Sequence, residues 1–121
     1  MPYDDEQAQK DVQANFPNMT IYYVFFLKKG SEWSPDSTPE IEELQKAHLA
    51  NYRRLAEIGK LAVTGPFLDS FAMVGDVRGM GVLKATSLAE AKELINSDPM
   101  VQAGRLTFEL HAWLIEKNIL P

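Results

Sequence analysis

Two residues of this sequence, His48 and Asp98, have side chains suited to proton transfer. Imidazole changes its charge near neutral pH, so a histidine can accept a proton and later donate it. A carboxylate beside the ring would orient it and favour its charged form. The two side chains therefore indicate acid–base chemistry on a small molecule, provided that the fold brings them together.

His48 falls within the apolar stripe of an expected helix, whose other members include Ile41, Leu44 and Leu55. A buried imidazole without a partner costs roughly 1–3 kcal/mol, so we expect it to have one. The alternative for His48 is a core histidine bonded to the backbone. The alternative for Asp98 is a simple cap on the turn that Pro99 begins.

Arg78 and Arg105 each start an expected strand. A planar guanidinium can hold an anionic substrate through two parallel hydrogen bonds, although such arginines are more often solvated or paired with acids. Gly65 and Pro66, which close another strand, are further candidates for substrate contact. Glu109 and His111 share a strand face, but no histidine at matching spacing joins them. We assign no metal site, and we expect no cofactor because nucleotide-binding motifs are missing.

Six elements position these residues. Thr20–Lys28 reads as a strand with two apolar faces, rich in aromatic and β-branched residues. A helix follows, capped by Thr38 and stopped by Gly59, and a second helix opens with the capping box Ser87-Leu-Ala-Glu90. The remaining strands are expected at 61–67, 78–86 and 105–115.

The order strand–helix–strand–strand–helix–strand is that of the ferredoxin-like fold, an α+β class. It predicts a four-stranded antiparallel sheet with both helices on one face. The end of the second helix should then lie near the first half of the other helix, which would place Asp98 close to His48. The second face of the sheet would be bare and apolar, with Tyr22, Val24 and Phe26, or the alternate side chains of the same strand, on it. Such a face usually marks an interface, so we expect a homodimer joined through the sheets.

The chain has 121 residues, which is enough for one domain. Residues 1–18 are polar and hold four acids and one lysine, so they read as an arm or leader that is dispensable for folding, with the domain at 19–121. A net charge of −5 argues against nucleic acid and against anionic membranes as partners. The absence of cysteine excludes thiol catalysis.

The longest apolar run, Ile21–Leu27, is too short to cross a bilayer, which takes about 20 residues. We therefore expect a soluble protein. Its expected location is the cytoplasm, or the periplasm if a leader has been removed.

Several pieces of the chain, in order, resemble the YCII-related family; they are His48-Leu-Ala-Asn-Tyr52, Gly59-Lys-Leu61, Gly65-Pro66-Phe67, Ser87-Leu-Ala-Glu-Ala91, Asp98-Pro99 and Ala103-Gly104. The similarity runs from about Thr20 to Ile115. It implies a dimeric α+β barrel and a catalytic pair that falls on His48 and Asp98. A dehalogenating lyase is among the known members.

We therefore predict a cofactor-independent enzyme of the lyase or isomerase type, which moves a proton on a small organic substrate. The alternative is a non-catalytic module that binds a small molecule or another protein. The loop Leu68–Asp76 is longer and more apolar than in close relatives, so the resemblance leaves the substrate open.

Overall fold

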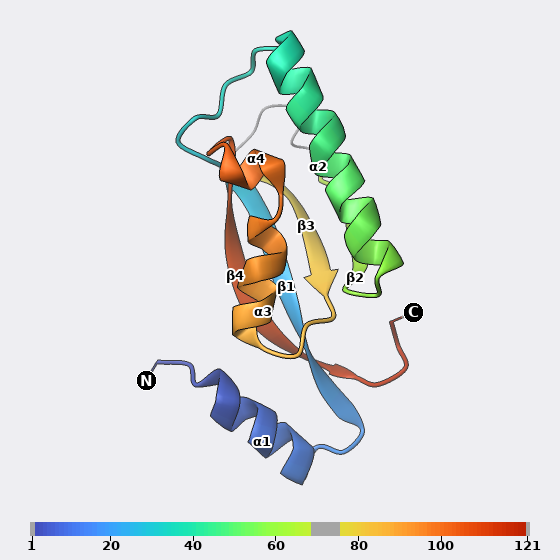
Figure 1. Ribbon diagram of the computed structural model, residues 1–121. Coiled ribbons are helices and arrows are strands. Elements are labelled where there is room, and N and C mark those ends of the chain that lie inside the picture. Colours follow the sequence, from blue (N-terminus) through green and yellow to red (C-terminus); the bar gives the residue numbers. More distant parts are fainter. Residues whose placement is uncertain (1, 69–75, 121) are drawn as a thin grey trace.

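The computed structural model describes residues 2–68 and 76–120, so most of the expected long loop lies outside the described residues. Four strands form one antiparallel sheet in the order β2-β3-β1-β4; they are β1 (Met19–Lys29), β2 (Leu61–Pro66), β3 (Val77–Leu83) and β4 (Leu106–Glu116). Helices α2 (Pro39–Glu57), α3 (Leu88–Asn96) and α4 (Pro99–Gln102) lie on one face of it (Figure 1). The predicted ferredoxin-like α+β fold is confirmed.

Strand β1 is central because both of its faces are apolar. Tyr23 and Phe25 point toward the helices and are fully buried, at 0% exposure. They pack in the main core with side chains from α2 and α3, among them Leu55 and Ile95. On the opposite face Val24 is also buried. The alternation along β1 predicted that both faces are apolar, and the structure shows that Tyr23 and Phe25 are on the face that meets the helices.

Both helices begin at the caps that the sequence predicted. The Thr38 hydroxyl accepts a hydrogen bond from Ile41 N at 3.2 Å, and the Ser87 hydroxyl accepts one from Glu90 N at 3.1 Å. These bonds satisfy amide groups that the first turn of a helix leaves without partners. Although α2 has 19 residues, neither it nor any other described helix is long and apolar enough to span a membrane.

The N-terminal segment contains a helix, α1 (Asp5–Asn15), that the sequence analysis did not expect. It lies at one end of the sheet, beside the start of β1 (Figure 1). One Asp5 oxygen accepts from the Tyr23 hydroxyl at 2.7 Å and the other from Leu88 N at 2.8 Å. Partial burial opposes ionisation, but these bonds hold the pKa of Asp5 below its ordinary value. The division of the chain at residues 18 and 19 stays a prediction.

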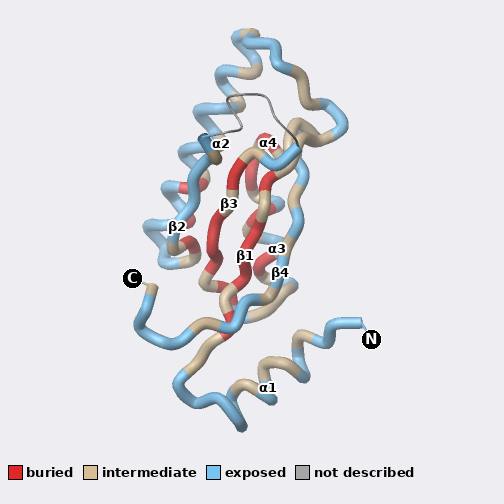
Figure 2. The backbone as a smooth tube through the Cα atoms, turned by 180° about the vertical axis from the view of Figure 1, so that it is seen from behind, coloured by how far each residue is buried: buried red, intermediate tan, exposed pale blue. Residues whose placement is uncertain are grey.

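The sheet face turned away from the helices, called the open face below, is seen in Figure 2. The strand register places these side chains on it: Tyr22, Val24, Phe26, Val63, Met80, Val82, Glu109, His111 and Trp113. Val63 is 56% exposed and Trp113 is 48% exposed. Glu109 and His111, weighed above as metal ligands, contact each other at 3.2 Å. The open face therefore combines large exposed apolar side chains with a small polar pair.

Candidate active site

His48 and Asp98 lie in direct contact. The Nδ1 atom of His48 is 2.8 Å from Oδ1 and 2.7 Å from Oδ2 of Asp98. The carboxylate is fully buried, whereas the histidine side chain keeps 12% of its surface exposed. Helix α2 carries His48 on its inward stripe, and Asp98 follows the end of α3, as the topology predicted. The two side chains can therefore act as one unit, and their catalytic role stays a prediction.

Asp98 is held in place by two further hydrogen bonds. Its Oδ1 atom accepts from Met100 N at 2.9 Å, which caps α4, and its Oδ2 atom accepts from the Tyr52 hydroxyl at 2.9 Å. Pro99 disfavours helical geometry at the residue before it, so the chain turns at Asp98. The turn directs the carboxylate toward both α4 and α2. The cap and the contact with His48 are thus made by the same buried carboxylate.

Tyr52 completes the cluster from one turn further along α2. Its ring meets His48 edge-on, with centroids 4.8 Å apart, and stacks on Phe25 at 5.9 Å. Burial, followed by the negative charge of Asp98, raises the pKa of the Tyr52 hydroxyl well above its ordinary value. The hydroxyl therefore stays protonated and donates to Asp98. Tyr52 was given no role from the sequence, although its spacing of four residues from His48 was a usable signal.

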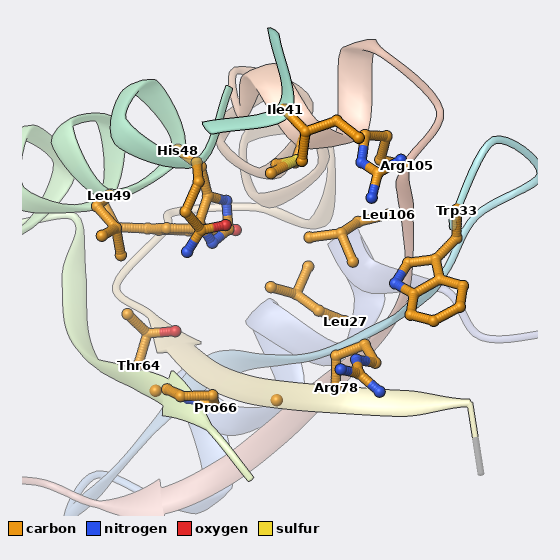
Figure 3. A pocket seen from close by; sticks show the side chains of 15 residues that line it. Leu27, Trp33, Ile41, His48, Leu49, Thr64, Pro66, Arg78, Arg105 and Leu106 are labelled. Carbon is orange, nitrogen blue, oxygen red and sulfur yellow. The ribbon is translucent and has the colours of Figure 1, made fainter. Parts of the chain in front are cut away.

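A cavity of about 500 Å³ opens beside His48 (Figure 3). This volume is within the range of small-molecule sites. The four residues predicted to contact substrate, Arg78, Arg105, Gly65 and Pro66, all line it. Asp98 does not, because it lies behind the histidine ring. The structure thus brings the six predicted site residues to one place.

The two arginines are held by the segment between β1 and α2. Arg105 Nη2 donates to Ser34 O at 2.8 Å, and Nη1 donates to Glu32 O at 3.2 Å. The Arg78 guanidinium lies over the Trp33 ring, 5.4 Å from its centroid. Trp33 also lines the cavity, and sequence reasoning missed it because nothing in a loop pattern shows where a single tryptophan will fold back.

The hydrogen bonds define which nitrogen of His48 is available for chemistry. An ionised carboxylate can only accept, so Nδ1 carries a proton toward Asp98. In the part of the chain that the structure describes, the other ring nitrogen, Nε2, has no hydrogen-bond partner. In the neutral ring Nε2 is then a proton acceptor at the cavity. This arrangement can remove a proton from a bound molecule and return it.

Comparison with known proteins agrees with this fold. A solved structure of the 5-chloro-2-hydroxyhydroquinone dehydrochlorinase of Burkholderia phenoliruptrix, in complex with 2,5-dihydroxybenzoquinone, is similar with a TM-score of 0.55 and 22% identity. The match covers 76% of this chain and 92% of the dehydrochlorinase. A search of curated protein sequences finds no match. The family model of the YCII-related domain matches residues 3–110, and the chain therefore belongs to the YCII-related domain family.

Proposed function

We propose that this protein is an acid–base enzyme of the lyase or isomerase type, in which His48 moves a proton on a small organic substrate. One observation carries the proposal. A single histidine has one ring nitrogen bonded to the buried Asp98 carboxylate and also lines a cavity of about 500 Å³. Such a base typically contributes about 10²–10⁴-fold to the rate.

The proposed reaction begins when Nε2 of His48 takes a proton from a carbon atom of the substrate. In an elimination, the electron pair of the broken C–H bond forms a double bond, and the leaving group departs with its own pair. In an isomerisation, the same proton returns to another atom of the substrate. The ring is positively charged in between, and Asp98 offsets that charge at 2.7 Å. The step calls on no cofactor, because His48 both takes and releases the proton.

The name of the Burkholderia enzyme supports the elimination. A dehydrochlorinase removes hydrogen and chloride, which needs a base for the hydrogen. At 22% identity the likeness extends to the fold, so the choice of substrate is a separate proposal. A small ring compound with an acidic C–H bond and a leaving group fits both the cavity volume and the proposed base.

We also propose that the protein works as a homodimer joined through the open face. Trp113 and Val63 are about half exposed there, and water around such large side chains is unfavourable. A second copy would cover them by packing sheet against sheet. An interface of this kind buries on the order of 2,000 Å² or more.

The catalytic proposal is tested with His48→Gln. Turnover is measured as halide release from 5-chloro-2-hydroxyhydroquinone and from a panel of related halogenated ring compounds. We expect the variant to lose at least about 100-fold in kcat. His111→Gln is the matched control, since His111 is the chain's other histidine and lies exposed on the open face. A His48→Gln protein with wild-type turnover contradicts the proposal. Compounds that raise the melting temperature without being converted favour the non-catalytic binding module.

A further inference from the structure

The cavity has a positively charged end in a negatively charged protein. The chain carries a net charge of −5. Among the described residues that line the cavity, the permanently charged side chains are Arg78 and Arg105, and none is an aspartate or glutamate. Cations without acids among the described wall residues, in an acidic chain, point to a ligand of negative charge.

Arg105 has no counter-charge among the residues that the structure describes. Its hydrogen bonds go to uncharged oxygen atoms of Glu32 and Ser34, two of them backbone carbonyls. Within the described ranges, no carboxylate lies within ion-pair distance of its guanidinium, and its buried Nε atom has no hydrogen-bond partner. A partly buried charge without an opposite charge is costly, so it is usually found where something else supplies that charge.

Trp33 gives the same end of the cavity a flat wall, and two cations lie over its ring. The Lys29 ammonium lies 4.2 Å from the centroid of its ring, and the Arg78 guanidinium lies 5.4 Å from it. Figure 3 shows His48 on one side of the cavity and Trp33 with both arginines on the other, with Leu27 and Leu106 between them. The middle of the cavity is therefore apolar and its two ends are polar.

We propose that the site takes a flat organic anion, bound with its charged group at Arg78 and Arg105 and its hydrogen-bearing carbon at His48. The part that concerns His48 rests on the proposed function; the part that concerns anion binding stands on the arginines. A guanidinium fork suits a carboxylate, and the leucines suit the body of a ring. Fixing the charged group at one end sets which carbon reaches Nε2, and such positioning contributes to rate.

The test compares anions with neutral molecules of the same shape. Binding of benzoate and 2-hydroxybenzoate is measured by calorimetry and thermal shift, beside benzamide and 2-hydroxybenzamide. We expect the acids to bind at least about tenfold more tightly than the amides, and added salt to weaken the acids more. Equal binding of acids and amides, or binding of neither, overturns the proposal.

Variants locate the binding. Arg78→Gln and Arg105→Gln should each weaken benzoate binding about tenfold or more, since each removes a charge-assisted hydrogen-bond donor. Arg105→Gln also removes the hydrogen bond to Ser34 and could unfold the protein. In that case Arg78→Gln is the deciding variant. Arg53→Gln is the matched control, because Arg53 is exposed and lies outside the cavity. Unchanged benzoate binding in Arg78→Gln, or an equal loss in Arg53→Gln, overturns the proposal.

His48→Gln separates this inference from the proposed function. It should still bind benzoate, because the arginines are intact. Benzoate binding that depends on Arg78 but comes without His48-dependent turnover keeps the anion site and removes the catalytic proposal. Turnover that needs His48 but is equal for charged and neutral substrates keeps the catalytic proposal and removes the anion site.

Discussion

Asp98→Asn is the most informative single substitution in this protein. It removes the charge and keeps the shape. Asparagine is as good a helix cap as aspartate, so its remaining oxygen can still accept from Met100 N. Its amide nitrogen then faces His48 and the Tyr52 hydroxyl, where the wild type has an acceptor.

The expected loss of stability follows from these contacts. The bond between His48 and the carboxylate is charge-assisted, and such bonds contribute about 1.5–3 kcal/mol. The Tyr52 hydroxyl can rotate to accept from the new amide, so that contact is kept. We expect a net loss of about 2 kcal/mol, which for a chain of this size lowers the melting temperature by roughly 6–10 °C. The variant should therefore fold.

Turnover should fall much further than stability. The retained oxygen is still 2.8 Å from Nδ1, but a neutral amide no longer offsets the positive charge that the ring gains. Where the amide donates to Nδ1 instead, the ring proton moves to Nε2 and the base at the cavity is lost. We expect kcat to decrease by about 10²–10⁴-fold, with benzoate binding retained. Asp36→Asn, the same change at an exposed residue, is the control. A folded Asp98→Asn protein with wild-type kcat would refute the role of Asp98 in orienting the ring.

Three further predictions follow from the structure. Because the pKa of the Tyr52 hydroxyl is raised in the folded protein, the unfolded chain loses the hydroxyl proton at lower pH. The free energy of unfolding should therefore decrease as the pH rises above about 10. In alkaline denaturation, Tyr52→Phe should show a shallower decrease. Asp5 has a lowered pKa, so its contribution to stability should be present at neutral pH and lost as the pH falls below 3.8. Urea titrations of Asp5→Asn should converge with the wild type in acid, and a difference that stays constant with pH would contradict this. Trp113→Asp should give a folded monomer in sedimentation, while Ile58→Asp, exposed at the end of α2 on the helix side, should leave a dimer. A wild-type monomer at micromolar concentration would rule out the proposed interface.

The sequence predicted the elements that local physics controls. Alternation along β1 and the capping residues Thr38 and Ser87 depend on neighbours in the chain, so they could be read directly. Helix α1 could not, because it lacks a long apolar stripe and is attached by contacts that are distant in sequence. Asp5 reaches Leu88, 83 residues further along the chain. The cavity wall at Trp33 also depends on a folded-back loop.

The two interpretations of Asp98, as a helix cap and as a catalytic partner, turn out to be physically linked. The bond from Met100 N and the bond from Tyr52 each fix one oxygen of the carboxylate. With both oxygens fixed and the group fully buried, the carboxylate can meet the His48 ring in only one orientation. A free surface aspartate would have to be ordered for each reaction, whereas here folding has already ordered it. The cap is therefore part of what positions the base, and a loss of the cap should reduce catalysis as well as stability.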